Sequence, residues 1–200
     1  MPIRSAVYQF KITLKGIRPP IWRRIQVPET YSFWDLHVAI QDAMGWLDYH
    51  LHMFRFGDVR SKRAVQIGLP DDDPFLRDVP LLTGWEVPML SYFKEPGDKA
   101  AYDYDFGDGW EHEILLEGIV VRRTGEKYPK CLAGARACPP EDCGGIHGYA
   151  NLLKVVADPT HEEHENMMEW LGGSFSPSAF DPGEITFDDP KERLAIMLKG

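Results

Sequence analysis

Residues 8–14 alternate strictly between apolar and polar side chains, and this pattern restricts the fold more than any other feature of the chain. A period of two predicts a β-strand with one buried and one solvated face. A break at 16–20, which contains two prolines, separates it from a second extended segment at 21–27. Proline interrupts a strand because it lacks the backbone N–H, so we expect two strands joined as an antiparallel hairpin.

A helix is predicted over 33–44. Ser32 is a suitable N-cap, Asp35 stands where a capping-box acid would stand, and Gly45 is a typical C-terminal stop. Shorter extended segments follow at 51–56 and 64–67. The acidic run 71–73 is interpreted as a solvated loop.

Gly107-Asp108-Gly109 lies between two further strand-like segments, 101–106 and 110–121. The glycines accept positive φ angles, so this is the strongest local hairpin signal in the sequence. Residues 130–147 are rich in Gly, Pro and Cys and are interpreted as a structured loop. Helices are expected at 148–157, 160–171 and about 190–198.

Strands precede helices without regular βαβ alternation, which favours an α+β fold: a mostly antiparallel sheet with helices packed on one face and a helical C-terminal third. We expect a single domain over 1–200, with 148–200 as a possible helical subdomain. The sequence starts without an apolar signal core and contains no long apolar run. A cytoplasmic protein with no membrane partner is therefore expected.

The net charge of −9 argues against a protein whose whole surface binds nucleic acid. The charge is uneven, however: residues 1–70 hold ten Lys/Arg against five Asp/Glu, a net of +5, and residues 71–200 carry −14. Either a basic face exists, or folding mixes the two halves. Arg18, Trp22, Arg23 and Arg24 are the candidate nucleic-acid contacts. The alternative is that these arginines pair with acids of the other half.

The hairpin segment carries a group of carboxylates that could bind a divalent metal ion. Asp103 and Asp105 share one strand face, and Glu111 and Glu113 share a face of the next strand. The alternative is a solvated outer face, with Asp108 suited to the tight turn. In that case the side chains turned inward are Tyr102, Tyr104, Phe106, Trp110 and His112.

The loop 131–147 offers a second group of possible ligands. Cys131, Cys138, Cys143 and His147 are candidates for zinc, although the spacing is not the paired C-x2-C of zinc knuckles. The alternative is three small, semi-buried free thiols. Glu141 and Asp142 follow two prolines and have no evident core role, so we expect them to face a cation, a backbone amide or an arginine.

A third histidine-containing segment is the run His161-Glu162-Glu163-His164-Glu165. On a helix, His161, His164 and Glu165 could chelate a metal ion, but the order is not H-E-x-x-H. A capped helix start, with acids in the first turn, is the simpler interpretation.

Four segments together identify a resemblance: 14–23 (LKGIRPPIWR), 104–112 (YDFGDGWEH), 138–145 (CPPEDCGG) and 169–173 (EWLGG). In this order, and over essentially the whole chain, they resemble the plasmid pRiA4b ORF-3-like family. The resemblance implies a single cytoplasmic α+β domain, often carried on mobile elements, without an established activity. It assigns no catalytic residues, and a resolvase label sometimes given to members finds no support in these residues.

The leading hypothesis is a binding or accessory module with a polar cleft built from the GDGW hairpin and the PPED loop. Its candidate residues are Asp105, Asp108, Trp110, His112, Glu141 and Asp142. The first alternative is a metal-dependent hydrolase of phosphodiesters, in which Asp105, Asp108 and Glu141 hold a divalent ion. His112 would act there as base or ligand. The second is a nucleic-acid-associated protein of mobile elements. The expected partner is accordingly a protein or a nucleic acid, and the possible cofactor is a divalent metal ion.

Overall fold

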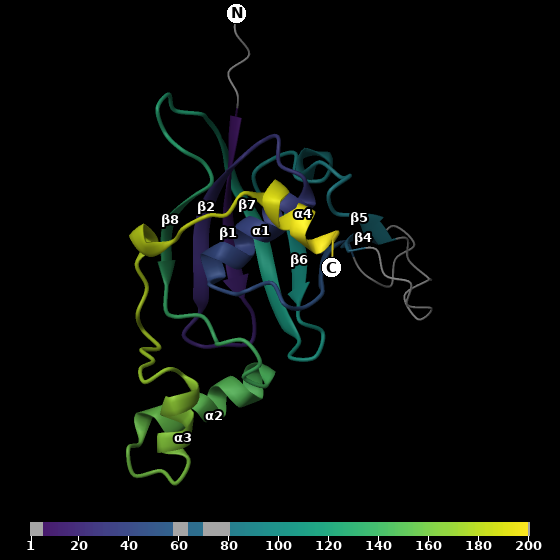
Figure 1. The fold of residues 1–200 in the computed structure, drawn as a ribbon. Coiled ribbons are helices and arrows are strands. Elements are labelled where there is room, and N and C mark those ends of the chain that lie inside the picture. Colours follow the sequence, from purple (N-terminus) through teal and green to yellow (C-terminus); the bar gives the residue numbers. More distant parts are fainter. Residues whose placement is uncertain (1–5, 58–63, 70–80, 200) are drawn as a thin grey trace, which may run out of the picture.

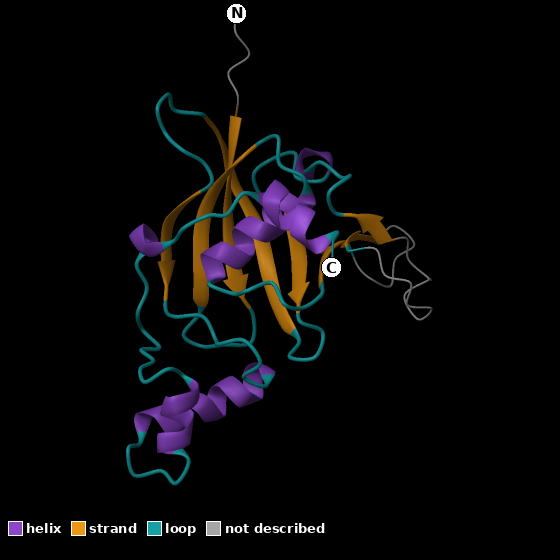
Figure 2. Ribbon diagram, in the orientation of Figure 1, coloured by secondary structure: helices purple, strands orange, loops and turns teal. Residues whose placement is uncertain are grey.

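The computed structural model describes residues 6–57, 64–69 and 81–199. In these residues an eight-stranded sheet carries helices on one face (Figures 1 and 2). The strand order is β5-β4-β3-β6-β7-β1-β2-β8, and every pair is antiparallel except β4–β5. The α+β class and the mostly antiparallel sheet are therefore as predicted. The acidic run 71–73 lies outside the described residues.

The first half of the chain builds the strands on both sides of the central β6–β7 pair and the helix that covers the sheet. Its elements are β1 (Ala6–Leu14), β2 (Ile21–Pro28), α1 (Phe33–Met44), β3 (His52–Phe56), β4 (Val65–Gly68) and β5 (Leu81–Thr83), followed by a short 3₁₀ turn, η2 (Met89–Ser91). The predicted hairpin is present, with Leu14 opposite Ile21. The capping box of α1 is also present, because Ser32 and Asp35 each accept the other's backbone N–H.

The second half supplies the central hairpin, one edge strand and the remaining helices. Its elements are β6 (Lys99–Tyr104), β7 (Trp110–Val121), β8 (Lys130–Ala135), α2 (Gly145–Ala157), α3 (His164–Trp170), the 3₁₀ turn η3 (Pro182–Glu184) and α4 (Pro190–Met197). α4 lies over α1, while α2 and α3 lie beyond one end of the sheet (Figure 1). A helical C-terminal third is not confirmed, because the stretch between α3 and α4 is irregular apart from η3.

Residues 130–135 form a strand, so the prediction of a loop there was wrong. β8 pairs with β2 at the sheet edge, although its residues carry no alternating apolar–polar pattern. At position 134 only glycine fits, since a Cβ there would lie 2.8 Å from the Trp22 carbonyl oxygen and 2.5 Å from the Phe180 ring. Close approach of the neighbouring segments excludes the larger residues that usually mark a strand.

The core lies between the sheet and α1. The inward residues of β1 and β2 are buried, as their alternation predicts, and Phe33 of α1 packs edge-on against Phe54 of β3. α4 and the segment before it cover the opposite side of α1, where Trp34 Nε1–H donates to the Pro190 carbonyl (2.8 Å). α1 is thus buried on both sides, and its polar residues must find partners inside the protein. No helix of the described residues has the length and apolar character needed to cross a membrane.

Candidate functional site

The turn between β6 and β7 holds Asp105 in a fixed position at the end of the sheet. Asp105 is 6% exposed, and its backbone adopts the left-handed conformation (φ 54°). Its Oδ1 accepts the N–H groups of Gly107 (2.9 Å) and Asp108 (3.2 Å). Asp is one of the few residues that tolerate this conformation, and the local hydrogen bonds stabilise it. The second carboxylate oxygen, Oδ2, takes no part in the turn.

The loop 139–144 packs against this turn. Gly144 N–H donates to Asp108 Oδ2 (3.1 Å), and a Cβ on Gly145 would lie 2.4 Å from the Asp108 carbonyl oxygen. Glu141 Oε1 accepts the Leu47 N–H (2.8 Å) and the Tyr104 hydroxyl (2.9 Å). The Glu141 Oε2 atom is buried without a hydrogen-bond partner. The GDGW hairpin and the PPED loop are therefore neighbours, and their carboxylates lie at the junction.

His50 joins the two segments. It belongs to the stretch 45–51 between α1 and β3, and its Nε2 lies 3.0 Å from Asp142 Oδ1 and 3.7 Å from Asp105 Oδ2. The Nε2 atom is shielded from solvent but has no aligned hydrogen bond. Asp142 is the exposed member, with 67% of its side chain accessible, and it too has a left-handed backbone (φ 56°). All three donor atoms lie within 4.8 Å of one another.

The structure separates the six predicted cleft residues into two groups. Asp105, Asp108, Glu141 and Asp142 lie at the junction, whereas Trp110 and His112 are buried in the core. His112 Nδ1 lies 3.2 Å from the Tyr102 carbonyl oxygen, and burial lowers the pKa of the imidazole to about 4. His112 is not among the histidines that the described structure groups with carboxylates.

Three of the four hairpin carboxylates lie on the outer face of the sheet, where cross-strand basic groups neutralise them. Asp103 pairs with Arg55, Glu111 with Lys15, and Glu113 with Lys99. Asp105 does not lie on this outer face, because β6 ends at Tyr104. The interpretation as a solvated face fits these residues, and the inward residues are buried as that interpretation requires, except Phe106, which is 49% exposed.

The candidate nucleic-acid residues of β2 are divided between its two faces, with Trp22 and Arg24 on the outer face and Arg23 turned into the core. Arg23 is buried at 2% exposure, Arg24 forms two hydrogen bonds to Glu117, and the Trp22 ring lies beside the Arg24 guanidinium at 5.2 Å. Of the four, only Arg18 is exposed. As the alternative anticipated, basic residues of the first half pair with acids of the second.

The cysteines are free thiols in the described structure, and the structure does not bring them and His147 into a group of donors within 4.8 Å. Burial raises the pKa of all three, that of Cys143 to about 12. They are accordingly protonated near neutral pH. In the other histidine-containing segment, α3 begins at His164, whose Nδ1 lies 2.8 Å from the Val155 carbonyl oxygen. That contact links α3 to α2.

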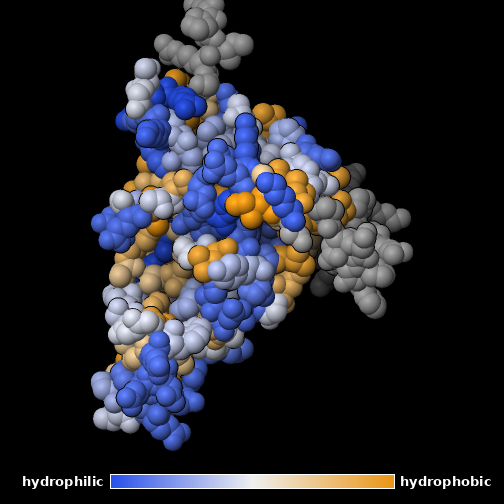
Figure 3. Space-filling model, in the orientation of Figure 1, coloured by the Kyte–Doolittle hydropathy of each residue, from blue (hydrophilic) through white to orange (hydrophobic). Residues whose placement is uncertain are grey.

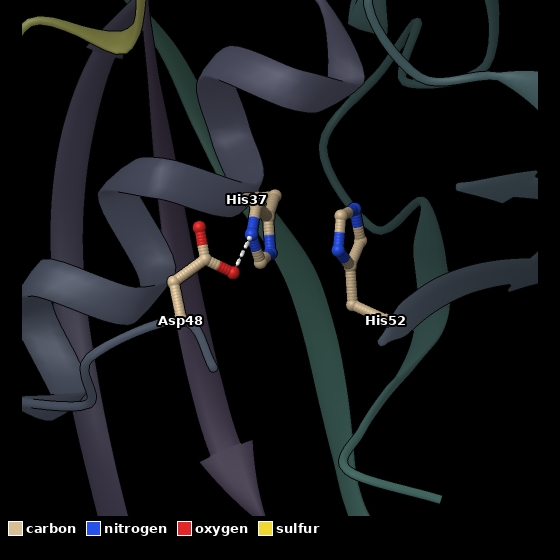
Figure 4. A group of neighbouring side chains, drawn as sticks. All are labelled: His37, Asp48 and His52. Atoms are coloured by element: carbon tan, nitrogen blue, oxygen red, sulfur yellow. Dashed lines mark hydrogen bonds and ion pairs between the residues drawn. The ribbon is translucent and has the colours of Figure 1, made fainter. Parts of the chain in front are cut away.

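A second polar group, which the sequence did not reveal, lies under α1 (Figure 4). His37 Nε2 contacts Asp48 Oδ1 (2.7 Å), and its Nδ1 contacts the Tyr102 hydroxyl (2.8 Å). Because a carboxylate only accepts, Nε2 carries the proton and Nδ1 accepts from Tyr102. The Tyr102 oxygen in turn accepts the Gln41 amide N–H (2.8 Å). This chain fixes the position of Asp48.

His52 stacks on His37, with ring centroids 3.4 Å apart and ring planes 7° from parallel. Burial lowers the pKa of both histidines, so both rings are neutral. Asp48 and the two histidines lie close enough to be considered as metal ligands. Imidazole lone pairs lie in the ring plane, however, and those of two parallel stacked rings cannot converge on one ion. We therefore interpret this group as a hydrogen-bonded support for Asp48.

A cavity of about 770 Å³ opens between the end of α1, the segment 45–51 and α4. Asp48 and His50 both line it, so it adjoins both polar groups. The only sequence signal for this region is the alternation Asp48-x-His50-x-His52 just before a strand. Period two would place the three side chains on one face, but Asp48 has a left-handed backbone (φ 60°), which redirects the chain.

Comparison with known proteins places the chain in a family. The model of the family described as plasmid pRiA4b ORF-3-like protein matches residues 6–184. Uncharacterized protein y4hQ of Sinorhizobium fredii is 40% identical over 176 residues, covering 88% of this chain and 86% of that protein. The crystal structure of MM3350, a protein of unknown function from Methanosarcina mazei Go1, superposes with a TM-score of 0.81 at 44% identity, covering 92% of this chain and 100% of the other. On this evidence, and with the motif segments of the hairpin and the loop packed together at one site, the chain belongs to the plasmid pRiA4b ORF-3-like family.

Proposed function

We propose that the protein is a binding module whose polar cleft, between the 105–109 turn and the 139–144 loop, takes a divalent metal ion. His50, Asp105 and Asp142 are the proposed ligands. The observation that carries the proposal is the spacing of their donor atoms, 3.0 Å and 3.7 Å from His50 Nε2. Donors bound to one ion at about 2.1 Å stand about 3.0 Å apart in an octahedron and about 3.4 Å apart in a tetrahedron.

The chemistry of the donors supports the same ligand. One imidazole and two carboxylates suit Zn²⁺ or Mn²⁺ better than Ca²⁺, which prefers oxygen ligands alone. Asp105 is held by the turn through Oδ1, which leaves Oδ2 for the ion. The exposure of Asp142 leaves coordination positions open to solvent or to a partner's polar group. A hydrolase that uses His112 as its base has less support, because that side chain is fully buried.

The test is a titration of the chelator-treated full chain with Zn²⁺ and Mn²⁺, followed by calorimetry and thermal unfolding. We expect one ion per chain, and a ligand at a hundred times its Kd stabilises the fold by about 2.7 kcal/mol. Asp105→Asn and Asp142→Asn should each weaken binding at least about tenfold, whereas Asp103→Asn, on the outer face, should not.

A Cys143→Ala variant separates this site from the cysteine-based alternative. If the ion binds in the cleft, the variant should bind metal as tightly as the original chain. The proposal is wrong if both aspartate variants retain full binding, or if the cysteine variant abolishes it.

A further inference from the structure

The cavity beside α4 has an excess of negative charge on one wall. Arg193 lies against three aspartates: Asp42 Oδ1 at 2.8 Å, Asp48 Oδ2 at 3.3 Å and Asp188 Oδ2 at 3.3 Å. These four are the Asp, Glu, Lys and Arg side chains among the described residues that line the cavity. With all three carboxylates ionised, their net charge is −2. Charge in a partly buried site is poorly screened, so the wall attracts a cation.

The Asp48 carboxylate is held in a fixed position at this wall. His37 donates to Oδ1 and Arg193 approaches Oδ2, so both oxygens are fixed in place. A carboxylate has about four acceptor positions, so two remain available. The supporting residues are buried behind it, which means that a ligand would not have to reorganise them.

Apart from His50 and Thr186, the rest of the cavity is lined mostly by apolar and aromatic residues, including much of its rim. Trp34 and Trp46 are buried at 2% and 3% exposure and form inner walls. Leu47, Tyr49 and Ile196 line the same cavity while being 58%, 70% and 71% exposed. Apolar surface interrupts the hydrophilic surface around α4 (Figure 3). Exposed apolar side chains gathered at one cavity indicate a ligand with an apolar body.

We infer that this cavity binds a small organic cation, a primary amine on an apolar or aromatic body. Its ammonium group would contact Asp48, and its body would lie against the tryptophans and the apolar rim. A charged hydrogen bond at the carboxylate and the aromatic walls both favour such a ligand. The volume of about 770 Å³ falls within the range of small-molecule sites. This site goes beyond the proposed metal cleft and does not depend on it.

Three probes with the same aromatic body and different charge test the inference: phenethylamine, 2-phenylethanol and phenylacetate. Binding of each to the full chain is measured by NMR titration with EDTA present, so that the metal cleft stays empty. We expect the amine to bind at least about tenfold more tightly than the alcohol, and the carboxylate to bind most weakly.

Asp48→Asn is the matching variant. Asparagine tolerates the left-handed backbone and can still accept from His37. It should weaken amine binding at least about tenfold and leave alcohol binding unchanged, while Glu165→Gln on α3 provides an equal charge change away from the cavity. Equal affinities for the three probes, no saturation at millimolar concentration, or an unaltered Asp48→Asn variant would each overturn the inference. None of these results bears on metal binding, which is measured separately without EDTA.

Discussion

Replacement of Arg23 by methionine should destabilise the protein, because this arginine connects three parts of the fold. It lies on the inner face of β2 at 2% exposure. Nε donates to the Ala43 carbonyl (2.8 Å), and one terminal nitrogen contacts the carbonyls of Trp22 (2.9 Å) and Ala135 (3.2 Å). The guanidinium also lies 4.0 Å from the centre of the Phe180 ring.

The magnitude follows from two opposing contributions. A buried carbonyl left without its partner costs about 1–3 kcal/mol. The bond to Ala43 is buried and those to Trp22 and Ala135 are partly buried, so about 3–9 kcal/mol is an upper bound on the gross loss. Methionine retains much of the aliphatic packing and removes a buried charge, whose desolvation costs several kcal/mol. Desolvation also lowers the pKa of Arg23, as expected for a group with this cost. We expect a net loss of about 2–4 kcal/mol.

Urea unfolding of the Arg23→Met and Arg24→Met variants provides the measurement. Arg24 pairs with Glu117 on the partly exposed outer face, so its loss should change the unfolding free energy by no more than about 1 kcal/mol. If the two variants are equally stable, the connecting role of Arg23 is refuted. A role in phosphate contact would instead leave the unfolding free energy unchanged and reduce only nucleic-acid binding.

Two further predictions concern acid stability and the packing of the site. The pKa of His112 is about 4 when folded and about 6.5 when unfolded, so protonation favours the unfolded chain. The contribution of neutral His112 to the unfolding free energy is complete above pH 6.5 and is lost as the pH falls toward 4, by about 3 kcal/mol in total. Urea unfolding of a His112→Phe variant should show a smaller loss of unfolding free energy across this pH range. Gly145→Ala should destabilise the protein about 1–3 kcal/mol more than Gly109→Ala, since both glycines have positive φ but only Gly145 would place a Cβ against the Asp108 carbonyl. Equal losses for the two glycine variants, by thermal unfolding, would contradict the close packing of turn and loop.

The elements predicted correctly are those whose signals are local. The alternation at 8–14, the Ser32 cap and the glycines at 107–109 each depend on neighbouring residues alone, and each produced the expected element. β8 was missed because its residues carry no periodic pattern, and because Gly134 stands where a Cβ would meet the Phe180 ring, which is a tertiary requirement that the sequence does not display. Phe106 was placed inside by continuing an alternation beyond Tyr104, where the strand ends.

The candidate site could be predicted only in part for the same reason. The hairpin and the loop were identified from an excess of polar residues, and their carboxylates do meet. His50 could not be assigned to them, because residues 50, 105 and 142 are distant in sequence and meet only through the packing of three segments. His112 carries an imidazole next to acidic residues in sequence, but the period of a strand turns those acids to the opposite face.

The three aspartates at the two proposed sites all have a left-handed backbone conformation. Non-glycine residues with positive φ in the described structure are Asp48, Asp105, Asp142 and Arg136, so three of the four are these aspartates. Left-handed backbone costs about 1–2 kcal/mol, and asparagine or glycine would adopt it at least as easily. Asparagine would also reproduce the turn that Asp105 makes, but it would remove the negative charge. Asparagine variants at the three positions therefore separate the two explanations, turn geometry and cation binding, because they keep the turn and remove the charge.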